Sequence, residues 1–276
     1  MRSREGATPI TDREHLYEWL PPRDGEFAFC YGRGSGAPFG YYQGKKYDTF
    51  VFAEANLYRK YGKDWQQVFA ELTHRRLGSW GMNTIANWSS PDIYRMGRTP
   101  YTISLRARGA DIEGSKGHWG KFPDPFSTDF RESLAKSLEN HSYADADPWC
   151  IGFFVNNELS WGTDGISLAQ ATLASPATQP AKIALRDWLQ TKYENPAALN
   201  QVWETQYADW DAFMESTAVP QSDGATADLR EFYSRIADQY FSVIHETIRR
   251  LAPNKLDLVC RDRKSKRLNS SHRIRS

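Results

Sequence analysis

The feature that most constrains the fold is a continuous apolar run, WCIGFFV, at residues 149–155. Such a run is typical of a β-strand that other elements cover on both faces. Three further strands are expected at residues 82–88, 101–107 and 254–260. Because helical segments separate these strands, the order of elements predicts an α/β fold with a parallel sheet.

The segments between the strands carry apolar residues at helical spacing. Helices are expected at residues 47–81 with a break at Gly62, and at 127–142, 180–193, 195–207 and 224–253. No Gly-rich phosphate-binding motif follows a strand, which weakens the nucleotide-binding folds. A TIM-type (β/α)8 barrel has eight strands in about 250 residues. The four expected strands therefore predict a partial barrel.

Polar residues stand where the expected strands end, the place at which (β/α)8 barrels carry their chemistry. The apolar run is followed by Asn156 and then by Asn157 and Glu158, and LSWG comes next. A partly desolvated carboxyl beside aromatic residues suits general acid catalysis, so Glu158 is the candidate catalytic residue. Asn157 is suited to holding a sugar hydroxyl. The alternative is a surface-loop glutamate, or one that begins a helix.

Two other strand ends supply candidate substrate contacts. Asn87 and Trp88 end the first expected strand, and Arg106 ends the second. Trp88 is suited to stacking on a sugar ring, and Asn87 and Arg106 to hydrogen bonding with its hydroxyls. Each of the three could equally be a packed or solvated residue at the rim.

Two further aromatic positions are candidates for substrate binding. GHWG (117–120) places His118 and Trp119 between glycines, which suggests a lid over the cleft. A lone loop histidine is otherwise simply solvated. Trp161 is a candidate wall of a sugar subsite.

The composition supports a flat-ring ligand. The 276 residues include 10 Trp, 14 Tyr and 14 Phe, so aromatic residues make up 14% of the chain. Indole rings stack on sugar C–H faces, although a large Trp-rich core would also use them. Three widely spaced cysteines, Cys30, Cys150 and Cys260, form neither a disulfide framework nor a metal site. No cofactor or metal is expected.

The net charge of +1 hides an uneven distribution. Residues 261–276 hold seven Lys/Arg and one Asp, a net +6, which leaves −5 for residues 1–260. A mildly acidic body is not suited to nucleic acid, and no apolar stretch is long enough for a membrane span. We expect residues 1–260 to form the catalytic domain and 261–276 to be a non-native or disordered tail.

Several blocks together resemble glycoside hydrolase family 50, the β-agarases. FFVNNELSWG is similar to the family's acid/base segment, and further blocks follow in the family's order: DREHLYEWLPP (12–22), ANLYRKYGKDW (55–65), RLGSWGMNTIANWSSP (76–91), PYT (100–102), FPDPFSTDF (122–130), LNQVWETQYADWD (199–211) and NKLDLVCR (254–261). The likeness covers roughly residues 8–261.

The resemblance implies a retaining hydrolase that cleaves β-1,4-galactosidic bonds in agarose or its oligosaccharides. Glu158 would be the acid/base after the fourth barrel strand, within a fragment that spans roughly strands two to five. The nucleophile, a second glutamate after strand seven, is expected to have no counterpart here, because nothing after Cys260 supplies strands six to eight. As substitutes, Asp111, Glu113 and Glu246 do not end a strand, so none is assigned. The fragment alone is therefore expected to be inactive. Asn156 stands where the family usually has Asp.

Other interpretations stay open. The parent protein could cleave another galactoside, as β-galactosidase-like barrels do, or the chain could be a non-catalytic carbohydrate-binding protein. An open half-barrel could also fail to fold stably, since it exposes strand edges. The expected partner is a polysaccharide or oligosaccharide, and the resemblance implies a secreted or periplasmic protein.

Overall fold

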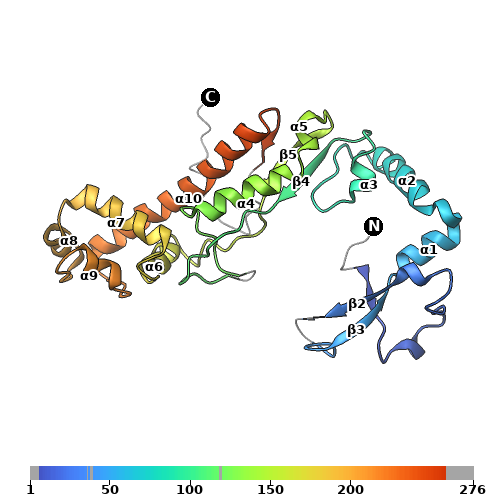
Figure 1. Cartoon of the computed structure of the whole chain (residues 1–276), viewed down its shortest axis with the longest axis horizontal. Helices are drawn as coiled ribbons and strands as arrows, with labels where there is room; N and C mark the ends of the chain where they lie inside the picture. Colours follow the sequence, from blue (N-terminus) through green and yellow to red (C-terminus); the bar gives the residue numbers. More distant parts are fainter. Residues whose placement is uncertain (1–5, 36, 38–39, 118–119, 259–276) are drawn as a thin grey trace. The chain divides into compact units, whose positions relative to one another are not determined.

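The computed structural model describes residues 6–35, 37, 40–117 and 120–258. The chain divides into two units between Pro100 and Tyr101, and each is described by itself. The fold is mixed α/β: the first unit carries an antiparallel sheet, and the second a parallel sheet with helices (Figure 1).

The sheet of the first unit was not predicted from the sequence. It pairs β3 (Lys46–Phe50) with β1 (Thr8–Pro9) on one side and β2 (Tyr31–Ser35) on the other, both antiparallel. The expected helix from residue 47 was therefore wrong over its first residues. Partner strands satisfy the backbone of β3, and its buried Phe50 joins Ile10, Phe27, Cys30 and Ala55 in the core.

The remainder of that predicted helix is confirmed. It consists of α1 (Phe52–Tyr61), a 3₁₀ turn η4 (Gly62–Asp64) and α2 (Trp65–Ser79). Gly62 has a φ of 71°, a conformation that glycine adopts readily, and this interrupts the helix where expected. The unit also contains 3₁₀ turns η2 (Glu14–Leu16) and η3 (Ala28–Cys30) and the short helix α3 (Pro91–Tyr94).

Residues 82–88 do not form the expected strand. Ile85 is buried and its N–H donates a 2.8 Å hydrogen bond to the carbonyl of Pro100. A strand requires a ladder of such bonds, and within this segment Ile85 forms a single β-bridge among the described residues.

The second unit contains the predicted parallel sheet. Its order is β4 (Tyr101–Leu105), β5 (Cys150–Val155) and β6 (Leu256–Asp257). The segments 101–107 and 149–155 are confirmed as strands. The last strand is shorter than the expected 254–260, and Cys260 lies outside the described residues.

The predicted helices of this unit are present, together with three shorter ones. They are α4 (Thr128–Glu139), α5 (Tyr143–Ala146), α6 (Ser167–Leu173), α7 (Pro180–Tyr193), α8 (Pro196–Trp203), α9 (Trp210–Glu215) and α10 (Asp223–Leu251). Ser127 is the N-cap of α4, since its hydroxyl accepts a hydrogen bond from the N–H of Asp129. The helix α10 packs against α4, α6, α8 and β6.

The helices α6 to α9 gather around the N-terminal end of α10 (Figure 1), and we call them the helical lobe. Two buried charged groups join its parts. Lys182 donates 2.7 Å hydrogen bonds to the carbonyls of Ser175 and Ser216, which follow α6 and α9. Asp228 on α10 accepts hydrogen bonds from Lys192, Tyr193 and Trp203 on α7 and α8. Within the described residues, no helix has the length and hydropathy of a membrane span.

Candidate active site

The carboxyl ends of β4 and β5 lie next to each other. Their parallel register pairs Leu105 with Val155, and the N–H of Asn156 donates a 2.9 Å hydrogen bond to the carbonyl of Leu105. Arg106 and Asn156 therefore follow paired residues at one edge of the sheet. The two strand ends predicted to carry polar side chains at residues 106 and 157–158 are brought together here.

Asn156 fixes the turn that follows β5. It is buried, with a φ of 59°. Asparagine tolerates this left-handed conformation better than most residues. Its Oδ1 accepts a 3.0 Å hydrogen bond from the N–H of Ala107, and its Nδ2 donates to the hydroxyl of Tyr240 at 3.2 Å. One side chain thus connects the ends of β4 and β5 to α10.

Glu158 stands on this turn in a half-buried position, directly after half-buried Asn157. Its φ is 50°, in a region that non-glycine residues seldom occupy. Holding such a residue there costs about 1–3 kcal/mol, and conformations of this kind are frequent at functional sites. The geometry sets a carboxyl at a strand end, where a substrate-binding edge is expected in a parallel sheet.

Trp161 lies in an aromatic cluster. It is 5% exposed, and its ring is 4.6 Å from that of Phe122, 5.4 Å from Tyr240 and 5.8 Å from Phe241 between centroids. Its indole N–H finds no acceptor in the described part of the chain. The role of Trp161 as the wall of a sugar subsite stays a prediction, because most of its surface is covered by these neighbours.

Arg106 is exposed, and its backbone N–H donates a 3.2 Å hydrogen bond to the hydroxyl of Ser137 on α4. Asn87 and Trp88 belong to the first unit. There Trp88 is 66% exposed and borders a hollow of about 420 Å³ together with Trp65 and Phe69. Asn87 is half-buried.

His118 and Trp119 lie outside the described residues. The residue before them is placed: Gly117 packs so tightly against Ser160 that a Cβ on the glycine would collide with it. The start of the GHWG loop therefore lies close to the chain that follows Glu158.

The sequence reasoning missed two residues that shape this region. Tyr240 is fully buried within α10. In the sequence it is indistinguishable from the other apolar positions of this amphipathic helix, so nothing singled it out. Asp124 is fully buried and accepts hydrogen bonds from Gln179 Nε2 at 2.6 Å and from the N–H of Ala181 at 2.8 Å. It thereby ties the loop before α4 to the start of α7. Burial raises the pKa of Asp124, against the opposing effect of these hydrogen bonds.

The other carboxyls considered for the chemistry do not closely follow a strand end. Asp111 and Glu113 are exposed on the loop after β4. Glu246 is exposed on α10 and accepts a 3.0 Å hydrogen bond from Arg131 on α4. Within the described ranges, no group of three or more side chains has the arrangement of a metal site.

Comparisons with known proteins point to one kind of enzyme. β-Agarase B of Vibrio sp. (strain JT0107) is 30% identical over 262 residues, which are 89% of this chain and 27% of that protein. β-Agarase A of the same organism is 32% identical over 216 residues, or 71% of this chain and 22% of that protein. No protein-family model matches the chain.

Solved structures agree with the sequence comparisons. The crystal structure of an agarase, AgWH50C, matches 93% of this chain with a TM-score of 0.80 and 29% identity, over 39% of its own length. The structure of an exo-β-agarase matches 91% of the chain with a TM-score of 0.80 and 30% identity.

The proteins that the chain resembles over most of its length belong to one class of enzyme, the glycosidases. More narrowly, the chain is a homologue of the β-agarases of glycoside hydrolase family 50. It spans about a quarter of the length of the curated relatives.

Proposed function

We propose that the chain is the acid/base-bearing part of a retaining β-agarase that cleaves β-1,4-galactosidic bonds in agarose or its oligosaccharides. The observation that carries this proposal is the position of Glu158, which has a left-handed conformation on the turn that follows the buried strand β5. The similarity to agarases supplies the substrate class.

We further propose that β4, β5 and β6 are three successive strands of a (β/α)8 barrel, the third to the fifth. The parallel order β4-β5-β6 with helices in the connections supports this assignment. We assign residues 1–260 to the catalytic part; the tail predicted at residues 261–276 lies outside the described residues.

In this mechanism Glu158 protonates the glycosidic oxygen as the bond to the leaving sugar breaks. It then removes a proton from the water that hydrolyses the glycosyl-enzyme. Asn157 holds a sugar hydroxyl beside the reacting carbon, and Arg106 hydrogen-bonds the substrate from the neighbouring strand end. Asn87, Trp88, His118, Trp119 and Trp161 are proposed as further substrate contacts.

The covalent intermediate needs a second carboxyl about 5–5.5 Å from the first. Among the described residues, Asp111 and Glu113 are exposed on a loop, and Glu246 on α10 forms an ion pair with Arg131 on α4. None of the three is therefore assigned as the nucleophile. We place the nucleophile in the part of the agarases that this chain does not span. The chain by itself is then inactive on agarose.

A chimera tests the role of Glu158. Residues 8–258 replace the matching segment of β-agarase B, and Glu158→Gln is compared with Glu132→Gln, an exposed glutamate on α4. Loss of a general acid costs about 10²–10⁴-fold, so Glu158→Gln is expected to lose that much rate on agarose while Glu132→Gln keeps it.

A second substrate separates an acid/base from a structural role. An aryl galactoside with an acidic phenol as leaving group needs no protonation, so Glu158→Gln should retain its glycosylation rate there. Azide should then restore turnover, because it attacks the intermediate without a general base. Equal losses on both substrates, or no loss on agarose, would contradict the proposal. A chimera that binds agarose oligosaccharides but hydrolyses none would favour a carbohydrate-binding protein.

A further inference from the structure

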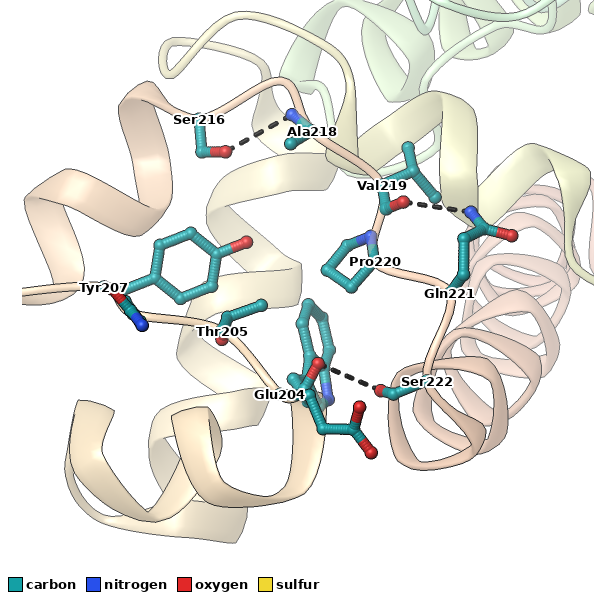
Figure 2. Close-up of a pocket in the computed structure, with 11 residues that line it drawn as sticks. Glu204, Thr205, Tyr207, Ser216, Ala218, Val219, Pro220, Gln221 and Ser222 are labelled. Carbon is teal, nitrogen blue, oxygen red and sulfur yellow. Dashed lines mark hydrogen bonds between the residues drawn. The ribbon is translucent and has the colours of Figure 1, made fainter.

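A second hollow lies in the helical lobe, between the end of α8 and the beginning of α10. Its volume is about 690 Å³, within the range of roughly 300–1,000 Å³ that small-ligand pockets occupy. Figure 2 shows the rings of Tyr207 and Pro220 bordering the same space, with Thr205 and Glu204 along another side. We call it the lobe pocket.

Glu204 occupies a position that disfavours glutamate. It follows the last residue of α8 with φ 56° and ψ 45°, a left-handed conformation usually taken by glycine or asparagine at this place. A carboxylate there also faces the negative end of the helix dipole. Its side chain has no ion pair or hydrogen-bond partner among the described residues. Departures from local rules of this kind are expected at functional or strained sites.

The wall beside Glu204 is held rigidly by Asn200. The Oδ1 of Asn200 accepts hydrogen bonds from the hydroxyl of Thr205 at 2.8 Å and from the N–H of Tyr207 at 2.9 Å. Its Nδ2 donates to the carbonyl of Tyr207 at 2.8 Å. A wall fixed before a ligand arrives loses little entropy on binding.

The floor is fixed in the same way. The indole N–H of Trp203 donates a 2.7 Å hydrogen bond to Asp228, and its carbonyl accepts one from the hydroxyl of Ser222 at 3.0 Å. The lining therefore combines ring faces with a set of hydrogen-bonding groups. Burial raises the pKa of Tyr207, against the opposing effect of a hydrogen bond with Ser216.

The charge of the lining narrows the ligand class. Glu204 is the one charged side chain among the residues that border the pocket in the described part of the chain. Its carboxylate accepts hydrogen bonds from hydroxyl groups and repels anions. Aromatic and proline rings pack on the C–H faces of sugars, while carboxylate and amide groups bind their hydroxyls.

We propose that the lobe pocket is an accessory binding site for a neutral saccharide unit, built on elements other than the strand end that carries Glu158. The pocket chemistry alone supports a neutral sugar. That the sugar belongs to a galactan chain rests on the proposed function. Such a site would hold the polymer close to the enzyme by raising its effective concentration.

The test uses the whole 276-residue chain and isothermal titration calorimetry. The probes are a neutral tetrasaccharide of agarose and a sulfated tetrasaccharide of carrageenan. We expect the neutral probe to bind and the sulfated probe to bind at least tenfold more weakly. Glu204→Gly should weaken binding of the neutral probe at least fivefold while the melting temperature stays the same or rises, because glycine relieves the left-handed strain.

Glu194→Gly is the matched control. Glu194 also has a positive φ, 61°, at the end of α7, but it does not line the pocket. This variant should keep the affinity of the unchanged chain. The proposal is overturned if the unchanged chain does not bind the neutral probe, if Glu204→Gly binds it equally well, or if Glu194→Gly weakens binding to the same extent.

Glu158→Gln distinguishes this proposal from the proposed function. Glu158 is not among the lining residues of the lobe pocket, so binding that Glu158→Gln removes belongs to the strand end, and binding that Glu204→Gly removes belongs to the lobe pocket. If Glu158→Gln abolishes binding and Glu204→Gly does not, the lobe pocket is not the binding site and the catalytic assignment still stands. If Glu204→Gly alone weakens binding while the chimera shows no role for Glu158, only the proposed function fails.

Discussion

The side-chain amide of Asn156 donates a 3.2 Å hydrogen bond to the hydroxyl of Tyr240, and both residues are buried. This contact joins the turn that presents Glu158 to the middle of α10. The same amide accepts a hydrogen bond from Ala107, so the turn is fixed from β4 and α10 together. The position of the candidate acid/base therefore depends on a helix far from it in sequence.

We expect Asn156→Ala to lower the free energy of unfolding by about 2–4 kcal/mol. The substitution leaves the N–H of Ala107 without its acceptor and puts alanine into a left-handed conformation. Urea unfolding measures the loss. Asn156→Gly removes the same bonds but tolerates the conformation, so it should recover about 1 kcal/mol of it. Equal losses for the two variants would show that backbone strain plays no part.

A second prediction concerns the junction of β5 and β6. Gly152 lies so close to the backbone of Leu256 that an added Cβ would collide with its carbonyl oxygen. Gly152→Ala should therefore separate the strands and destabilise the chain by about 1–3 kcal/mol. Gly165→Ala is the control, since a Cβ there meets no atom within 4 Å. A thermal melt in which both variants match the unchanged chain would contradict the tight packing.

The elements with a strong local signal could be predicted from the sequence. The apolar runs of β4 and β5, the capped helix α4 and the amphipathic helix α10 carry their own periodicity, and their parallel order followed from the alternation. The antiparallel sheet could not be predicted in this way. Its strand β2 has the sequence YGRGS, with almost no apolar pattern, and its stability comes from pairing with β3.

In the candidate site, too, features with a local sequence signal could be predicted and tertiary contacts could not. The place of Glu158 just beyond a strand end was predictable, because the apolar run of β5 ends three positions before it. The hydrogen bond that holds its turn in place could not be predicted, because Asn156 and Tyr240 are separated by 84 residues and only the fold brings them into contact. At residues 82–88 the sequence predicted a strand that is not formed. The segment has a strand-like pattern but no ladder with a neighbouring strand, so it is a loop in which Ile85 donates a hydrogen bond to Pro100.

A third prediction concerns buried Lys182. Its ammonium donates to the carbonyls of Ser175 and Ser216, which would otherwise be left unpaired beyond the ends of α6 and α9. Lys182→Met should lower the free energy of unfolding by about 2–4 kcal/mol. The loss is limited because burying the ammonium also costs free energy, as the lowered pKa of Lys182 shows, and methionine removes that cost. Arg186→Met, on the same helix with an exposed partner, should cost under about 1 kcal/mol. Chemical denaturation in which the two variants are alike would refute the bridging role.

The last prediction is a loss of stability at alkaline pH through Tyr193. Burial, and then the hydrogen bond to the carboxylate of Asp228, raise the pKa of Tyr193 to about 12. The folded chain holds this proton more tightly than the unfolded chain, in which tyrosine has a pKa of about 10. The stabilisation is therefore complete below pH 10 and is lost as the pH rises through about 12.

Tyr193→Phe removes this titration. The difference in unfolding free energy between the unchanged chain and Tyr193→Phe should shrink as the pH is raised from 10 toward 12, as measured by urea unfolding at each pH. Asp228→Asn removes the charged acceptor, so in that background the same tyrosine substitution should show a smaller dependence on pH. A difference that stays constant across this range in the chain with Asp228 intact would mean that Tyr193 gains no proton affinity on folding.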